Sequence, residues 1–144
     1  MAEDAARVLR LPPTARSTTQ ARRFVVSAID EWQLEGLRET AALLTSELVT
    51  NSVLHARTEV EVSIARTADG VSIEVKDGSQ RSPVRRLQYD EATTGRGVEL
   101  LEQLAGSWDV TLRDDGKTVR FTLSEVADPW AAYTGAEWAK RSEQ

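Results

Sequence analysis

The sequence predicts an α+β fold: a two-layer sandwich in which one mostly antiparallel, mixed sheet is covered on one face by helices. Two observations carry this prediction. Segments of alternating apolar and polar residues occur in pairs joined by short turns, at 58–77 and 108–125, which indicates two hairpins. Two segments with apolar residues at helical spacing lie together before the first hairpin. Helices grouped between hairpin-connected strands are typical of α+β domains, and such a sheet leaves its other face open to solvent or to a partner.

Composition places the chain among ordinary single-domain globular proteins and excludes several classes of function. A net charge of −5, from 23 acidic and 18 basic residues, argues against a nonspecific nucleic-acid binder, which usually carries a basic stripe. The lack of cysteine and the single histidine, His55, exclude a disulfide scaffold, a thiolate metal site and a His-rich zinc site. The acidic start is no signal peptide, and no segment approaches the ~20 apolar residues of a membrane span. We therefore expect a cytoplasmic protein without membrane contact.

The first predicted elements are a short strand and a helix. The stretch "ARVLRLPP" alternates briefly and stops at two prolines, which indicates an edge strand. Ser17 or Thr18 is expected to cap the helix that follows. Apolar residues recur at helical spacing as far as Trp32, and Gly36 is expected to mark the break.

The remaining elements follow in the order helix, hairpin, loop, helix, hairpin. A second helix is expected from about Leu37 to His55, followed by the hairpin 58–77. Periodicity then vanishes from Gly78 to Thr94, and loops longer than about 12–15 residues inside a compact domain are usually functional. The stretch "GVELLEQLAG" restores a helix, and 108–125 forms the last hairpin.

The chain therefore divides into one predicted domain, residues 8–125, and a C-terminal tail, residues 126–144. Three aromatic residues of the tail, Trp130, Tyr133 and Trp138, would suit a short amphipathic helix docked on the domain. A packed or frayed end is favoured over a binding role for this tail. No internal repeat or low-complexity tract is present.

Three polar residues interrupt the apolar second helix. Glu47, Asn51 and His55 are spaced four apart, so they lie on one face of a helix. An asparagine oxygen suits a hard cation such as Mg²⁺, and a glutamate one turn earlier is placed to orient or deprotonate a nucleophile beside it. Spacing alone favours the simpler interpretation, in which Glu47 faces solvent and Asn51 caps or packs.

Two further motifs carry candidate ligand contacts. Asp77 ends an apolar strand and is followed by Gly78, where ligands often bind, although Asp-Gly is also ordinary turn chemistry. In "TTGRGVELL", Gly95 and Gly97 open a helix, whose free N–H groups favour phosphate, and Arg96 adds a charged donor. A flexible hinge is the alternative. The pattern is neither a P-loop nor a dinucleotide-binding fingerprint.

Taken in order, "ELVTNSVLHA", "VKDGSQ", "TTGRGVELLEQLAGSWDV" and "DDGKTVRFTL" resemble the ATP-binding domain of the GHKL (Bergerat-fold) superfamily. The chain is most similar to its small branch, the anti-sigma-factor serine kinases of bacterial stress and sporulation switches. The resemblance covers about residues 8–125. It implies the Bergerat fold, ATP and Mg²⁺ as cofactors, and an antagonist protein and a sigma factor as partners.

The resemblance also implies roles for individual residues. In this family an asparagine holds Mg²⁺ between ATP phosphates, which falls on Asn51, and the glutamate one turn earlier, Glu47, acts as general base or orients the attacking group. An aspartate recognises the adenine amino group, matching Asp77, and a threonine late in the sheet supports it, matching Thr118. The implied metal ligand is Asn51. The implied cofactor-binding residues, including the phosphate-cradling glycines, are Asn51, Asp77, Gly78, Gly95, Arg96, Gly97, Val98 and Thr118.

The chain departs from the family in the box that follows its third strand. The family pattern D-x-G-x-G is replaced by Asp-Gly-Ser-Gln-Arg at 77–81, which alters the floor of the adenine pocket. Arg85 and Arg86 in the same loop could reach phosphate or a partner, but a solvated loop is favoured. His55 has no family role, and a core histidine bonded to backbone is favoured over a ligand.

Two function hypotheses remain in competition. The first is a Mg·ATP-dependent kinase that phosphorylates a serine or threonine of an antagonist protein and sequesters a sigma factor. The second is a nucleotide-gated protein-interaction switch with little or no phosphotransfer, suggested by the altered box at 77–81. A detached histidine-kinase catalytic domain ranks lower, because no dimerisation helix pair with a phospho-accepting histidine is present. The intact Glu47 favours the kinase, and the resemblance makes a homodimer plausible.

Overall fold

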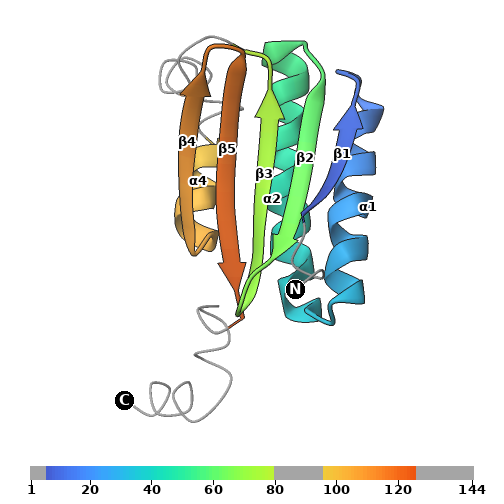
Figure 1. Cartoon of the computed structure of the whole chain (residues 1–144), viewed down its shortest axis with the longest axis vertical. Helices are drawn as coiled ribbons and strands as arrows, with labels where there is room; N and C mark the ends of the chain where they lie inside the picture. Colours follow the sequence, from blue (N-terminus) through green and yellow to red (C-terminus); the bar gives the residue numbers. More distant parts are fainter. Residues whose placement is uncertain (1–5, 80–95, 126–144) are drawn as a thin grey trace.

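The computed structural model describes residues 6–79 and 96–125 of the chain. Within them, five strands form one sheet in the order β1-β2-β3-β5-β4, and all four neighbouring pairs are antiparallel. Figure 1 shows this sheet with the helices lying behind it, all on one face. The strands are β1 (Arg7–Leu11), β2 (Val60–Arg66), β3 (Gly70–Asp77), β4 (Ser107–Arg113) and β5 (Gly116–Ser124).

The helical layer consists of α1 behind β1, α2 behind the centre of the sheet and α4 behind β4 (Figure 1). A 3₁₀ turn leads into α2, and a π-helical segment continues from its end. The α-helices are α1 (Arg16–Glu31), α2 (Arg38–Asn51) and α4 (Arg96–Leu104); the 3₁₀ turn is Glu35–Leu37 and the π-helical segment is Ser52–Ala56. The predicted α+β two-layer architecture is confirmed. The predicted mixed sheet would contain a parallel pair of strands, and none is present among the described strands.

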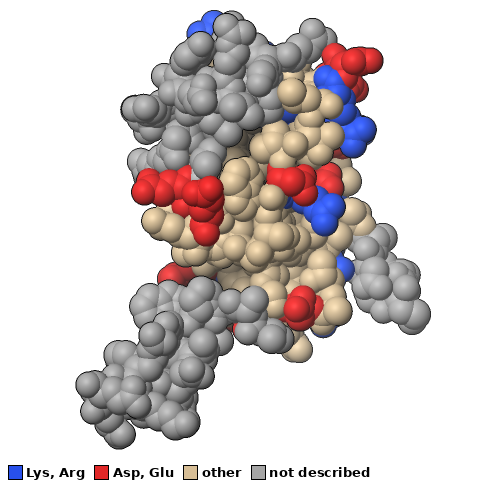
Figure 2. Space-filling model, turned by 90° about the vertical axis from the view of Figure 1, so that its left-hand side faces the viewer, with Lys and Arg blue, Asp and Glu red and all other residues tan. Residues whose placement is uncertain are grey.

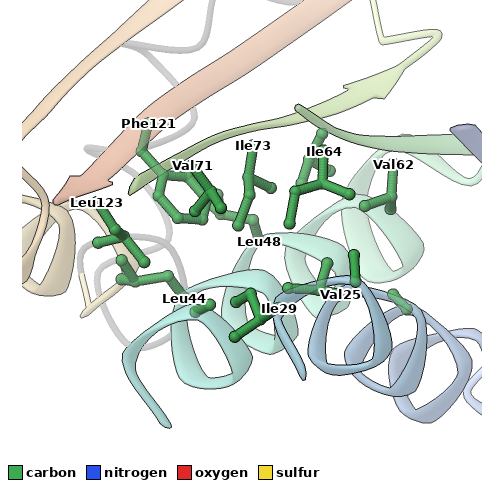
Figure 3. Close-up of a cluster of buried hydrophobic side chains, with 14 of the residues drawn as sticks. Val25, Ile29, Leu44, Leu48, Val62, Ile64, Val71, Ile73, Phe121 and Leu123 are labelled. Atoms are coloured by element: carbon green, nitrogen blue, oxygen red, sulfur yellow. The ribbon is translucent and has the colours of Figure 1, made fainter. Parts of the chain in front are cut away.

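The core lies between the sheet and the two long helices. Alternate residues of the strands point toward the helices, as the period of two requires. Figure 3 shows Val25 and Ile29 of α1 and Leu44 and Leu48 of α2 facing the inward side chains of the strands. Burial of each such side chain stabilises the fold by about 1.5–3 kcal/mol. The fully buried strand residues are Val60, Val62, Ile64, Val71, Ile73, Val75 and Phe121.

The ends of the first helix differ from the sequence-based expectation. Neither Ser17 nor Thr18 caps α1, which begins at Arg16 without a side-chain cap. The hydroxyl of Ser17 instead donates to the carbonyl of Pro12 at 2.5 Å, which ties the helix to the end of β1. The helix breaks before Gly36, at Gln33, which takes a left-handed φ of 59°. Tertiary packing of Trp32 sets this end, because its side chain is buried in the core.

The face of the sheet without helices is polar and balanced in charge. Glu74, Arg120 and Asp109 are neighbours across β3, β5 and β4, so charges of opposite sign alternate along this row. Figure 2 views the molecule from the β4 side, and the acidic side chains there form separate groups, several beside a basic one. Within the described residues seen in this view, the basic side chains do not form one continuous surface.

Two predicted segments, the loop that includes 80–95 and the tail 126–144, fall largely or wholly outside the described residues. The domain boundary at 8–125 stays a prediction. None of the helices in the described part of the chain is long and apolar enough to cross a membrane.

Candidate functional site

Asn51 is the last residue of α2 and lies at the layer boundary between helices and sheet. Only 7% of its surface is exposed, so its amide is largely withdrawn from water. Glu47, one turn earlier, is half-buried, which matches neither a fully buried carboxylate nor a freely solvated one. The predicted stacking of these two residues on one face of α2 follows from the helix bounds.

Beyond Asn51 the helix widens into the π-helical segment Ser52–Ala56. It ends at Arg57, which has a left-handed φ of 57° and whose N–H donates to the carbonyl of Ser52 at 3.2 Å. Such π turns are uncommon and often occur at functional sites. Here the segment carries Ser52, which is buried against the end of β3, and His55, which is half-buried.

The carboxylate of Asp77 is held at the end of β3 by two neutral donors. The Ser52 hydroxyl donates to Oδ2 at 2.7 Å, and the Ser79 backbone N–H donates to Oδ1 at 2.9 Å. The side chain is 1% exposed. Asp77 continues the inward-facing series of Val71, Ile73 and Val75, so its carboxylate lies on the same side of the sheet as the helices. A buried carboxylate at the end of an apolar strand is placed for recognition of a polar group rather than for exposure to solvent.

Lys117 lies directly across from Asp77 on β5, and sequence reasoning missed it. The two residues are register partners, and the Lys117 Nζ is 3.4 Å from Asp77 Oδ2. Thr118 pairs instead with Lys76, so its side chain lies on the opposite face of the sheet from the Asp77 carboxylate. The structure therefore does not bring Thr118 to the predicted site.

Gly78 follows Asp77 and is fixed by Thr58, two residues before the start of β2. The Gly78 N–H donates to the Thr58 hydroxyl at 2.7 Å, and a Cβ on Gly78 would lie 3.2 Å from that side chain. This close approach directs the chain after Asp77 over the end of the sheet. Thr58 is a second residue that sequence reasoning missed, because only the fold brings it near Gly78.

The start of α4 approaches the end of α2. A Cβ added to Gly97 would lie 3.2 Å from the Asn51 side-chain nitrogen, so the glycine allows the helix start to rest against the buried amide. Arg96 and Val98 lie in the first turn of α4, and their side chains, like all of Gly95, are outside the described part of the chain. The structure thus brings together the α2 motif and the glycine of α4, which are 46 residues apart in the chain (97 minus 51).

The donor set fits a nucleotide whose magnesium ion is held mainly by the phosphates of that nucleotide. Among the described residues, no group of three His, Cys, Asp or Glu side chains could hold a metal ion. Asn51 offers one amide oxygen, and Mg²⁺ is commonly bound through one or two protein ligands together with substrate phosphates and water. Asp77 offers a second buried acceptor group, a carboxylate whose side chain is 1% exposed.

A separate hollow of about 370 Å³ opens at the same end of the sheet, on the face without helices. Three of its lining residues, Arg10, Glu61 and Lys76, form one outward-facing row across β1, β2 and β3. Its lining carries charges of both signs, and it lies on the other side of the sheet from the Asp77 carboxylate. Asp77 and Gly78 also line the hollow, so it adjoins the candidate site at the end of β3.

Comparison with known proteins gives one family match. The family model described as the histidine kinase-like ATPase domain matches residues 11–123. A search of curated proteins finds no match. The matched range extends from Leu11, the last residue of β1, to Leu123, the last residue but one of β5, and it contains every residue of the candidate site.

Proposed function

The chain belongs to the histidine kinase-like ATPase domain family, and from this premise we propose that it is a Mg·ATP-dependent serine/threonine protein kinase. Its substrate would be a small antagonist protein, and a sigma factor would be its second partner. The observation that carries the proposal is the contact between the start of α4 and the buried amide of Asn51. This contact supports a phosphate site, because the free N–H groups of a helix start favour negative charge.

Each part of the cluster has a role in this proposal. Asn51 would hold the metal ion, Gly97 would allow the backbone of α4 to approach the phosphates, and Asp77 would accept a hydrogen bond from adenine. When bound, Mg·ATP supplies the phosphoryl group and neutralises its developing charge. The protein contributes positioning: α2, β3 and α4 hold these three residues on a rigid two-layer scaffold.

Glu47 is the proposed general base. It lies one turn before Asn51 on α2 and is half-buried, so a hydroxyl group of a second protein can approach its carboxylate. General-base catalysis typically contributes about 10²–10⁴-fold in rate. We expect Glu47→Ala to lose phosphoryl transfer by a factor in this range while Mg·ATP binding is retained.

The test is transfer of labelled γ-phosphate from ATP to a panel of small anti-anti-sigma-type antagonist proteins, with ATP affinity measured in parallel. Glu39→Ala is the matched control, because Glu39 is an exposed glutamate in the first turn of the same helix. Transfer by Glu47→Ala at the wild-type rate would remove Glu47 from the mechanism.

The second candidate is a nucleotide-gated interaction switch with little phosphotransfer. It is favoured by the altered box after β3, where buried Ser79 stands in place of a glycine and its N–H is committed to Asp77. ATP binding by the wild type without transfer to any antagonist would support this candidate over the kinase. Limited proteolysis of the whole chain would then change on addition of Mg·ATP; equal cleavage patterns would contradict a switch. The homodimer and the cytoplasmic location stay predictions.

A further inference from the structure

The side of α2 that faces away from the sheet carries exposed leucines. Leu44 and Leu48 point into the core (Figure 3), whereas Leu43 is 39% exposed and Leu54, in the π-helical segment, is 50% exposed. They are two of the four large apolar side chains that are exposed in the described part of the chain. Half-buried Glu47 follows Leu43 by one helical turn, so it lies between the two leucines along the helix. We call Leu43, Glu47 and Leu54 the outer strip of α2.

The chain leaves the sheet beside the end of α2 at which the outer strip begins. After β5, the Glu125 N–H donates to the carbonyl of Asp69 at 3.0 Å. The Glu125 side chain reaches the helical layer, because a Cβ on Gly36 would lie 3.5 Å from its Oε2. Gly36 belongs to the 3₁₀ turn that leads into α2. The tail that follows Glu125 therefore starts beside the N-terminal end of α2.

The tail, residues 126–144, lies outside the described part of the chain, and its sequence predicts an amphipathic helix. Asp128 is a preferred N-cap residue, and Pro129 suits the first helical position. Large aromatic side chains then fall on one face of such a helix, since they recur at helical spacing. These aromatic residues are Trp130, Tyr133 and Trp138. A face of this kind requires an apolar surface to pack against.

The start of the tail is long enough to reach the outer strip. From Gly36 to Leu43 the helical rise is about 10 Å. Five residues lead from Glu125 to Trp130 (130 minus 125), and five extended residues span at most ~18 Å. Trp130 can therefore meet Leu43.

The aromatic face also matches the length of the strip. A helix rises by about 12 Å from Trp130 to Trp138, and Leu54 lies about 16 Å beyond Leu43 along α2. With Trp130 at Leu43, Trp138 lies past Glu47 and close to Leu54. A tail helix that runs alongside α2 therefore spans the carboxylate of Glu47.

We propose that residues 126–144 dock on the outer strip of α2 and shield Glu47 from the protein substrate. The docking stands on the exposed leucines, the exit point of the chain and the matching lengths; only the effect on Glu47 rests on the proposed function. A substrate protein has to displace the tail before its hydroxyl group reaches the Glu47 carboxylate. The tail thereby controls access of the second protein, while the nucleotide contacts of Asn51 and Gly97 are left unchanged.

The first experiment tests the docking itself by disulfide cross-linking of the full chain. The protein has no cysteine, so Glu47→Cys combined with Thr134→Cys reports on one contact. Thr134 lies one helical turn after Trp130, as Glu47 does after Leu43, and the pair leaves the leucines and aromatic residues in place. The matched control combines Thr134→Cys with Val8→Cys, because Val8 is 51% exposed on the side of the sheet without helices.

We expect an intramolecular disulfide in the Glu47→Cys pair to form at least about tenfold faster than in the control pair, since docking raises the effective concentration of the two thiols. Equal rates would overturn the docking. Disulfides formed mainly between two molecules would assign the strip to a second copy of the chain and also overturn it. Circular dichroism verifies folding, and Leu43→Cys, at an exposed position, replaces Glu47→Cys if that variant does not fold.

The second experiment tests the shielding by steady-state transfer of γ-phosphate to the antagonist protein. If the tail covers the strip nine-tenths of the time, Trp130→Ser combined with Trp138→Ser should lower the KM for the antagonist about tenfold. The kcat and the affinity for Mg·ATP should stay the same, and Val8→Ser serves as the control. An unchanged or raised KM would overturn the shielding. Absence of transfer by every variant would overturn the proposed kinase function, whereas the disulfide rates would still decide the docking.

Discussion

At the scale of single residues, the close approach of α4 to Asn51 depends on the absence of a side chain at Gly97. Gly97 has no Cβ, and the space a Cβ would occupy is bounded by the Asn51 amide at 3.2 Å. A contact of that length is tighter than ordinary packing, so an added methyl group must displace the amide or the helix start. Both of these carry proposed phosphate or metal contacts.

Gly97→Ala is therefore expected to weaken Mg·ATP binding by about tenfold, since overpacking costs ~1–3 kcal/mol. The fold should persist, because only a side-chain amide has to move. Gly106→Ala, just beyond the other end of α4, is the control: its Cβ would meet Thr122 at an ordinary 3.4 Å. Titration of the two variants compares them directly, and equal affinities would contradict the role of the Gly97 contact.

Residue-scale reasoning on the sequence named Asn51, Asp77, Gly97 and Thr118 as site residues. The structure brings Gly97 to Asn51, but it places Lys117 and not Thr118 beside Asp77. The error is one of strand register, because a shift of one residue moves a side chain to the other face. The sequence held the signal that would have prevented it. Val119, Phe121 and Leu123 alternate as the apolar face of the last strand, and that alternation places Lys117 on the same face. A lysine in the inward series contradicts ordinary burial preference.

At the scale of elements, α2 was predicted as one helix to His55, whereas the structure changes to a π-helical segment after Asn51. The sequence carries no distinct pattern for this change, because the same apolar residues fit either helix. The change is tied to a contact across the layers, in which the Ser52 hydroxyl meets Asp77. Ser52 could not be assigned to the site until β3 was placed against α2.

The turn between β4 and β5 positions Lys117, and Gly116 is the residue that makes this turn possible. Its φ is 153°, and a Cβ there would overlap the backbone oxygen of Asp77. A residue with a Cβ would be strained at this φ, and its Cβ would overlap backbone atoms, which cannot move aside as a side chain does.

We expect Gly116→Ala to lower the free energy of unfolding by about 3 kcal/mol or more, measured by urea denaturation. Gly36→Ala is the control, since its Cβ would meet only Glu125 at 3.5 Å, and a change within about 0.5 kcal/mol is expected. If Gly116→Ala lowered the free energy of unfolding as little as Gly36→Ala does, β3 would have moved to relieve the overlap, and the prediction would be wrong.

At the scale of the whole molecule, the two-layer architecture could be predicted because the periods of two and 3.6 were clear in most elements. Val60, Val62 and Ile64 were assigned to one face of a strand and are fully buried. The strand order was beyond sequence reasoning, since hairpin patterns fix which strands are joined but not that β5 lies between β3 and β4. That order is what brings Lys117 to Asp77.

Phe121 reports on the integrity of the whole core. It is fully buried on β5, and Figure 3 shows it among side chains of the adjoining strand and α2. Phe121→Ala is expected to lower the free energy of unfolding by about 3–5 kcal/mol, since large-to-small substitutions leave a cavity. Val8→Ala on β1, where Val8 is 51% exposed, should cost well under 1 kcal/mol. Comparable midpoints of urea denaturation for the two variants would contradict the described core.

The position of β5 also has a consequence for the order in which the protein is made. A nascent chain folds from its N-terminal side during synthesis. Residues of β4 leave the ribosome before those of β5, yet β4 joins the sheet only through β5, which pairs with both β3 and β4. Until β5 emerges, one edge of β3 is unpaired, and Asp77 has no Lys117 beside it. The Asp77–Lys117 pair thus forms only with the last strand of the sheet, and a ribosome stalled before residue 117 would carry a chain without it.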